Sequence, residues 1–211
     1  RYSAPLVPDP TPPEPCEVLV IESTYGDRTH PSSSISSQLE ELLAAIIASR
    51  GTLLIPAFAV GRSQQLLMFL NEVMTRRPEL ALAVHLDSPM AVDTTSIYRR
   101  YPEERGLEAL DLHSGDSVIY GPNVFLHRTR DDSLRLNSLP GPRVIISSSG
   151  MLAGGRVLHH LRRLLPRPEN RVVLSGYQAP GTRGWRLERV NRRCACTART
   201  CRYAPAWPRS A

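Results

Sequence analysis

The stretch Thr52-Leu-Leu-Ile-Pro-Ala-Phe-Ala-Val-Gly-Arg-Ser-Gln64 decides how this chain folds. Its first half is a short apolar run, as expected of a β-strand that is buried on both faces. A turn at Gly61 follows, and residues 62–76 continue with the periodic apolar pattern of a helix that Pro78 ends. The stretch therefore predicts a strand over residues 52–58, a tight turn and a helix, which is the repeating unit of a parallel α/β sheet.

The same alternation of apolar runs and amphipathic stretches continues along the chain. We predict further strands over residues 17–22, 80–86, 124–127, 143–148 and 171–175, and further helices over residues 37–49, 92–100, 131–136 and 155–165. Ser37-Gln-Leu-Glu40 has the spacing of a capping box at the start of the first helix. This order predicts an α/β fold with a mainly parallel sheet flanked by helices.

Polar residues follow several of the predicted strands. They include Glu22, Asp87, Ser88, the run from Ser147 to Ser149, Tyr177 and Gln178. Ligands of open parallel sheets bind outside the carboxyl ends of the strands. The pattern therefore predicts a binding site at this edge of the sheet.

The composition limits the class of protein. The 211 residues are enough for one sizeable core, no apolar run is long enough to cross a bilayer, and the N-terminus has no signal-peptide pattern. We therefore expect no membrane partner and a cytoplasmic location. The net charge is +6, and all 26 basic residues are arginine. A GC-rich gene explains this usage, and so does phosphate recognition by guanidinium groups; the sequence leaves both open.

Three loops carry residues suited to chemistry. Glu22-Ser-Thr-Tyr-Gly-Asp-Arg28 places a carboxylate beside a glycine turn, where it can orient a histidine or hold an arginine. Free backbone amides at a helix N-terminus, next to Arg62 and Ser63, form a candidate anion site. Ser147-Ser-Ser-Gly-Met-Leu-Ala-Gly-Gly-Arg156 is rich in glycine and hydroxyl groups, which suits close approach of a phosphodiester backbone. The first two loops also have plainer interpretations, as a solvated capping acid and a capped helix start.

Other signals are weaker. No Walker loop or Gly-x-Ser-x-Gly nucleophile motif occurs, and no Gly-x-Gly-x-x-Gly follows the first strand, which disfavours a Rossmann-like binder of small molecules. His159 and His160 are adjacent on a predicted helix and point in different directions, so we interpret them as structural. Cys194, Cys196 and Cys201 lie close together, but their spacing fits no common zinc pattern.

Five motifs, taken in order, resemble the β-CASP branch of the metallo-β-lactamase superfamily, whose members include ribonuclease J. They are Glu22-Ser-Thr-Tyr-Gly-Asp-Arg28, Pro56-Ala-Phe-Ala-Val-Gly-Arg-Ser-Gln64, Asp87-Ser-Pro-Met-Ala91, Ser149-Gly-Met-Leu-Ala-Gly-Gly155 and Gly176-Tyr-Gln-Ala-Pro-Gly-Thr182. The resemblance covers about residues 15–186. Five ordered motifs are a specific signal, whereas any one of them alone is not.

The resemblance implies a division of the chain into three parts. Residues 1–34 would be the end of a first segment of the metallo-β-lactamase αβ/βα fold, residues 35–186 a β-CASP domain, and residues 187–211 a tail. The intact family enzyme is an RNA hydrolase with two zinc ions, whose β-CASP domain covers the cleft and grips single-stranded RNA. The resemblance implies a catalytic role for Glu22 and substrate-binding roles for Tyr25, Arg62, Ser63, Asp87, Ser88, Ser148, Ser149, Gly150 and Gln178.

The zinc motif of the family is absent from this sequence. No His-x-His-x-Asp-His run occurs, and the family's later histidine motifs do not follow residue 179. We therefore expect the chain to bind no metal by itself and to be an inactive, RNA-binding part of a zinc-dependent RNA hydrolase. The alternative is a stand-alone nucleic-acid-binding module without catalysis. The sequence leaves open whether the protein forms a homodimer.

The composition changes near the end of the chain. When residues 193–211 are back-translated with GC-rich third bases and read two bases later, the result resembles what the family carries before its next motif. This indicates a shift of the reading frame between Trp185 and Asn191. An out-of-frame segment was never selected for a hydrophobic face, so we predict that residues 187–211 are disordered.

Overall fold

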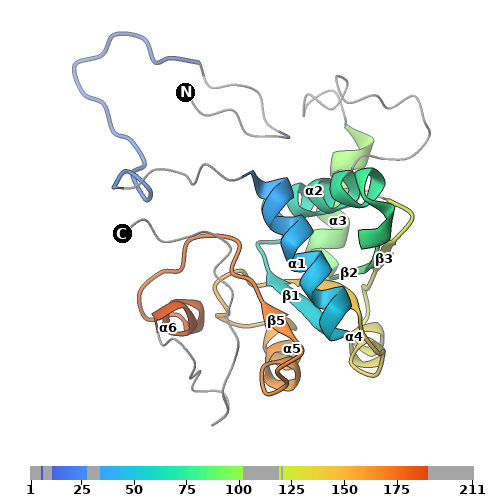
Figure 1. Cartoon of the computed structure of the whole chain (residues 1–211). Helices are drawn as coiled ribbons and strands as arrows, with labels where there is room; N and C mark the ends of the chain where they lie inside the picture. The colour runs from blue at the N-terminus through green and yellow to red at the C-terminus, as the bar shows by residue number, and fades with distance from the viewer. Residues whose placement is uncertain (1–5, 7–10, 28–33, 102–118, 120, 190–211) are drawn as a thin grey trace.

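The computed structural model describes residues 6, 11–27, 34–101, 119 and 121–189. In these ranges five strands form one sheet in the order β3-β2-β4-β1-β5, and every pairing is parallel (Figure 1). The strands are β1 (Thr52–Pro56), β2 (Ala83–Asp87), β3 (Val124–Leu126), β4 (Arg143–Ser147) and β5 (Arg171–Val172). The predicted α/β fold with a parallel sheet is confirmed.

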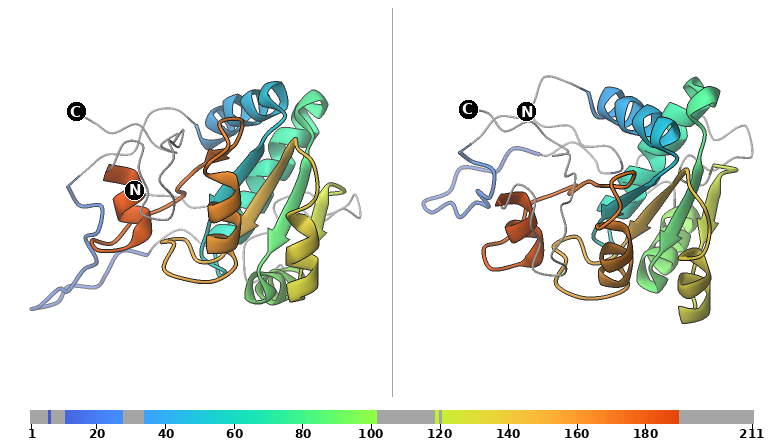
Figure 2. Two further views of the ribbon diagram at one scale, coloured as in Figure 1. Left: turned by 90° about the horizontal axis from the view of Figure 1, so that it is seen from below. Right: turned by 60° about the horizontal axis from the view of Figure 1, so that its bottom comes forward.

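Helices cover both faces of the sheet (Figure 2). They are α1 (Ile35–Ser49), α2 (Arg62–Arg76), α3 (Pro89–Arg100), α4 (Arg130–Leu136), α5 (Val157–Leu164) and α6 (Arg183–Arg189), and a 3₁₀ turn, η1 (Pro78–Leu80), follows α2. Side chains alternate along each strand, so Leu53 and Ile55 pack with α1, α2 and α3, whereas Leu54 packs with α4, α5 and α6. This two-sided burial explains why the strands are continuous apolar runs.

The start of α1 differs from the predicted one, whereas its end at Ser49 is the predicted one. The helix begins after Ser34, whose hydroxyl oxygen accepts a hydrogen bond from the amide of Ser37 at 3.1 Å, so the capping residue lies three positions earlier than predicted. At the other end Arg50 adopts the left-handed conformation, with φ of 52°. The next residue, Gly51, cannot carry a side chain, because a Cβ there would lie 1.9 Å from the backbone oxygen of Glu169.

The strand predicted for residues 17–22 is not formed. Its apolar side chains, Val18, Leu19, Val20 and Ile21, are between 59% and 91% exposed. Figure 1 shows the described N-terminal segment, residues 11–27, reaching away from the sheet. A strand needs the backbone of a neighbour for its hydrogen bonds, and none of the five strands pairs with this segment. The apolar pattern of residues 17–22 therefore led to a wrong strand prediction.

The C-terminal boundary also differs from the predicted one. Helix α6, which the sequence did not reveal, runs to Arg189 and buries Leu187 in the core. The helix therefore crosses the predicted boundary between residues 186 and 187. The rest of the predicted disordered tail, residues 190–211, lies outside the described residues. Within the described ranges, no helix combines the length and apolar character needed to span a membrane.

Two histidines meet at the β3 edge of the sheet. His85 Nδ1 on β2 lies 2.9 Å from His127 Nε2, which follows β3, and the ring of Phe125 stacks on His85 with 5.3 Å between ring centroids. Burial, followed by the positive charge of His127 and Arg143, lowers the pKa of His85 from 6.5 to about 4. His85 is therefore neutral in the folded protein at physiological pH.

The histidine pair predicts acid sensitivity. Because the pKa of His85 is lower in the folded than in the unfolded chain, unfolding takes up a proton, and the free energy of unfolding falls as the pH drops from 6.5 towards 4. We expect the His85 contribution to this loss to be about 2 kcal/mol between pH 7.0 and pH 4.5, less than the full difference in pKa implies, because pH 4.5 still lies above the folded-state pKa. Urea denaturation at pH 7.0 and 4.5 measures the loss in the free energy of unfolding. The His85→Gln variant, which lacks the titrating ring, is the comparison. An equal loss in both proteins would contradict the assignment to His85.

Candidate functional site

A cavity of about 320 Å³ opens at the carboxyl edge of the sheet. Its walls come from the loop between β1 and α2, the loop after β4, residues 175–178 after β5, and the N-terminal segment around residues 22–25. Parallel α/β sheets bind ligands at this edge. The volume lies in the range of about 300–1,000 Å³ that is usual for sites of small ligands.

Half of the predicted site residues meet in this cavity. They are Glu22, Tyr25, Arg62, Gly150 and Gln178. Five further residues line the cavity, namely Thr24, Phe58, Ser175, Gly176 and Tyr177. Tyr177 was predicted at this edge of the sheet but without a role, and the other four were missed. A usable signal existed for Phe58, because it is an aromatic residue inside a quoted motif at the end of a predicted strand.

The loop between β1 and α2 carries Phe58 and Arg62. Gly61 has a φ of 78°, a conformation that favours glycine, and turns the chain into α2. The Ser63 hydroxyl donates to the Phe58 carbonyl oxygen at 2.7 Å, and the amides of Ser63 and Arg62 donate to the carbonyls of Phe58 and Val60. The prediction of free amides at these two positions is therefore wrong, and Ser63 braces the loop instead of lining the cavity.

The Arg62 guanidinium is the cationic group of the cavity. In the part of the chain that the structure describes, no hydrogen bond or ion pair engages it. A guanidinium in this state is available for a phosphate oxygen. Gly150 lies opposite, and a Cβ there would come within 3.3 Å of the Phe58 ring.

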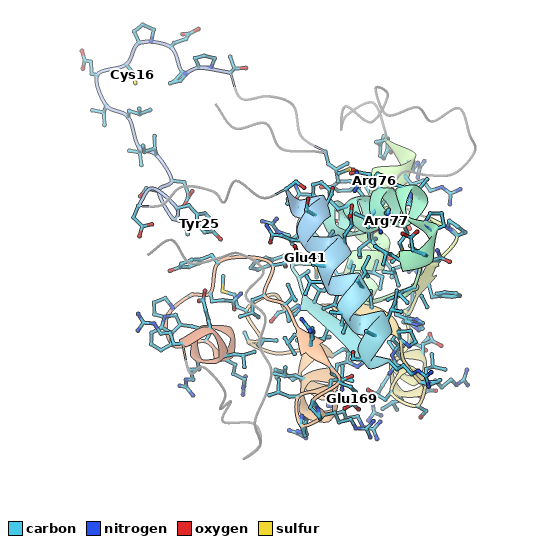
Figure 3. The ribbon with its side chains drawn as sticks, viewed as in Figure 1. Cys16, Tyr25, Glu41, Arg76, Arg77 and Glu169 are labelled. Atoms are coloured by element: carbon cyan, nitrogen blue, oxygen red, sulfur yellow. The ribbon has the colours of Figure 1, made fainter. Side chains whose placement is uncertain are left out.

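Glu22 and Tyr25 bring the N-terminal segment to the cavity. Hydrogen bonds from the hydroxyl and the amide of Thr24 hold the pKa of Glu22 below its ordinary value, so its carboxylate is ionised. The rings of Tyr25 and Tyr177 meet edge to face, with 6.2 Å between centroids and 85° between planes. Figure 3 shows Tyr25 in the part of the segment near the body of the protein and Cys16 further out along it.

Gln178 lines the cavity but serves mainly as a brace. Its side chain is buried, and Nε2 donates to the carbonyl oxygens of Gly150 at 3.1 Å and Gly176 at 3.0 Å. One amide group thus joins the loop after β4 to the loop after β5. Helix α6 packs behind it at Gly184, where a Cβ would lie 1.6 Å from Gln178 Oε1.

Three of the predicted serines form turns and caps near the cavity and do not line it. Ser88 caps α3 by accepting from the amide of Ala91 at 3.3 Å, so this helix begins three residues earlier than predicted. The Ser148 hydroxyl donates to Ser88 Oγ at 3.1 Å. Ser149 Oγ accepts from the amide of Ala153 at 3.0 Å. These hydroxyls hold the loop after β4 against the end of β2.

Asp87 was predicted to contact substrate, but its side chain is fully buried. The Ser133 hydroxyl donates to Asp87 Oδ2 at 2.6 Å, and Arg156 Nη1 donates to Oδ1 at 2.8 Å. Burial alone raises the pKa of Asp87, but hydrogen bonds from His160, Ser133 and Arg156 outweigh it and hold this pKa below its ordinary value. Asp87 is therefore a buried carboxylate that supports the site from behind.

His160 and Arg156 complete this network. His160 Nε2 lies 2.6 Å from Asp87 Oδ2, and Nδ1 lies 3.1 Å from Asn137 Oδ1. Both ring nitrogens of His160 therefore face oxygen atoms of buried or half-buried side chains. Arg156 also donates to the carbonyls of His127 and Arg128. The network joins the ends of β2 and β3 to α5, which agrees with the structural interpretation of His160.

The described residues do not supply a metal site. Among them, no three side chains of His, Cys, Asp or Glu lie close enough together to hold an ion. The cavity offers one carboxylate, one guanidinium, aromatic rings and backbone groups. These groups suit recognition of an anion that carries a planar or apolar part.

Comparison with known proteins identifies the family. The parallel sheet, its covering helices and the cavity at its carboxyl edge define an α/β domain, and the Beta-Casp domain family matches residues 63–187 of the chain. The match covers more than half of the sequence. The chain belongs to the β-CASP family, as its motifs predicted.

Several curated proteins are similar to this chain over most of its length. It is 37% identical to Ribonuclease TTHA0252 of Thermus thermophilus, over 85% of this chain and 42% of that protein. It is 34% identical to the RNase J-like protein of Methanocaldococcus jannaschii, over 87% of this chain and 42% of that protein. It is also 34% identical to Transcription termination factor FttA of Thermococcus kodakarensis, over 82% of this chain and 27% of that protein. The chain thus spans less than half the length of these relatives.

Proposed function

We propose that this chain is the RNA-binding cover of a metal-dependent RNA hydrolase. The Arg62 guanidinium carries the proposal, because no described residue forms a hydrogen bond or ion pair with it and Arg62 lines a cavity at the carboxyl edge of the sheet, where such sheets bind ligands. Family membership and similarity to a protein named as a ribonuclease support RNA as the ligand. The net charge of +6 adds a general attraction for phosphates.

The proposed work of the chain is binding and orientation. Arg62 contacts a phosphate oxygen of the RNA, and Glu22 lies in the same cavity, where its carboxylate can orient a neighbouring group. The described residues do not fit a zinc site, so the work proposed for them is binding and orientation. Two zinc ions and RNA cleavage are proposed for the intact enzyme alone.

Replacement of Arg62 by alanine should weaken binding of single-stranded RNA and flatten its salt dependence. Each phosphate contact contributes about one unit to the slope of log affinity against log salt concentration, so the slope should fall by about one. Gel-shift titrations of the chain at several salt concentrations measure both quantities. A loss of affinity with an unchanged slope would show that Arg62 is structural.

Arg167 provides the matched control for this experiment. It is exposed and follows α5, next to the part of the chain that meets Gly51 at the other edge of the sheet. Arg167→Ala removes the same charge without touching the cavity. We expect it to leave the salt slope nearly unchanged, which separates a local contact from the general effect of net charge.

A stand-alone nucleic-acid-binding module remains the second candidate, because the described residues hold no metal site. Both candidates predict salt-dependent RNA binding by this chain. They differ for the natural full-length protein, which cleaves RNA under the first candidate and only binds it under the second. A cytoplasmic location and a homodimer stay proposals, to be checked by cell fractionation and light scattering.

A further inference from the structure

Three aromatic side chains surround the cavity and are partly open to solvent. Phe58 is 49% exposed, Tyr25 41% and Tyr177 38%. They come from three separate segments, the β1–α2 loop, the N-terminal segment and the loop after β5. None of the three belongs to either hydrophobic core cluster. Core packing among the described residues therefore does not explain why aromatic rings stand at this position.

The rings are braced rather than loose. Ser63 fixes the backbone of Phe58 through its hydroxyl, and Gly150 packs close to the Phe58 ring. The edge-to-face contact between Tyr25 and Tyr177 fixes these two rings relative to each other. An edge-to-face pair leaves one ring face turned away from the contact, where a planar group can stack.

The charge and size of the cavity restrict what that planar group can be. Arg62 lies in the same cavity, so a ligand with a phosphate next to a flat ring meets both kinds of contact. A volume of about 320 Å³ is near the lower end of the range for small-ligand sites, so it suits one nucleotide and not a duplex.

We propose that Phe58, Tyr25 and Tyr177 form a stacking site for one unpaired nucleobase, beside the Arg62 contact to its phosphate. The proposal rests on the proposed RNA-binding function and specifies its substrate as single-stranded. Bases in a duplex already stack on one another, whereas an unpaired base can turn out and stack on protein aromatics. Because every base has a π-face, the site tolerates any sequence.

The experiment compares two ligands of equal charge. One is a single-stranded oligoribonucleotide, and the other is an abasic ribose-phosphate oligomer of the same length. Stacking of one base on aromatic residues should make the natural strand bind about 5- to 150-fold more tightly. The salt slopes should be equal, because both ligands present the same phosphates.

Variants then locate the preference. Phe58→Ala and Tyr177→Ala should each reduce the ratio of the two affinities, whereas Phe58→Trp and Tyr177→Phe should keep it. Phe125→Ala is the matched control, because Phe125 has the same exposed fraction as Phe58 but lies on β3, away from the cavity. It should leave the ratio unchanged.

The outcomes separate this inference from the proposed function. Equal affinity of the wild-type chain for the natural and abasic strands, with steep salt dependence, would overturn the stacking site and leave RNA binding intact. A wild-type preference that Phe58→Ala and Tyr177→Ala both retain would also overturn it. Absence of RNA binding by the wild-type chain would overturn both. The comparison of ligands needs no variant, so a misfolded variant does not weaken it.

Discussion

Replacement of Asp87 by alanine is expected to lower the free energy of unfolding by about 3–5 kcal/mol, because it removes one side of a buried charged network. The carboxylate is fully buried and accepts hydrogen bonds from Ser133, Arg156 and His160. Without the Asp87 carboxylate, the Arg156 guanidinium and the His160 ring lose a buried hydrogen-bond acceptor. Urea denaturation at pH 7 measures the loss.

The same variant should weaken RNA binding. Arg156 directly follows the loop after β4, and this loop carries Gly150 to the cavity. Asp87→Asn keeps an acceptor oxygen for Ser133 or Arg156 but loses the charge, so it should destabilise the protein less than alanine does.

Asp93 is the control for Asp87. It lies six residues further along the chain, in α3, and its carboxylate pairs with Arg128 at the surface, with both side chains more than half exposed. An exposed pair contributes about 0–1 kcal/mol, so Asp93→Ala should have little effect. If Asp87→Ala were as mild as Asp93→Ala, the buried network would not be a support of the fold.

Local sequence patterns were sufficient for the central sheet. The apolar runs of β1 and β4 stand between turn-forming residues and helices, and their observed ends lie within two residues of the predicted ones. Burial on both faces leaves a continuous apolar run in the sequence, which is readable without knowing the partner strands. The edge of the sheet where the cavity opens could be predicted for the same reason, because strand direction follows from the alternation with helices.

Long-range pairings could not be predicted in this way. Asp87 and His160 are separated by 73 positions, and Ser88 and Ser148 by 60, so no local spacing records that they meet. The sequence pattern predicted a ligand-binding role for all the polar residues at strand ends. In the structure some of them line the cavity, whereas others belong to the hydrogen-bond network around Asp87 behind it. The strand prediction for residues 17–22 was wrong for a related reason, because a strand depends on a neighbouring strand as well as on its own apolar pattern.

Replacement of Gly184 by alanine is expected to destabilise the fold by about 3 kcal/mol and to disturb the site as well. The new Cβ would lie 1.6 Å from Gln178 Oε1 and 3.1 Å from the Met151 carbonyl oxygen. The buried Gln178 amide must then move, and it loses its hydrogen bonds to the carbonyls of Gly150 and Gly176. Each broken bond contributes about 1 kcal/mol, and strain in the packed interior adds the remainder.

A double-mutant cycle tests whether Gln178 transmits this effect. If the clash between Gly184→Ala and Gln178 is the cause, the pair Gln178→Ala and Gly184→Ala should cost clearly less than the sum of the two single changes. Gly154→Ala is the control, since nothing lies within 4 Å of a Cβ there and its φ is not in the left-handed region. It should change stability by no more than about 0.5 kcal/mol. Strictly additive effects of the two changes would mean that α6 does not act on the site through Gln178.

Because Gln178 joins the two loops that present Gly150 and Tyr177, we expect RNA affinity to fall with Gly184→Ala and to be unaffected by Gly154→Ala.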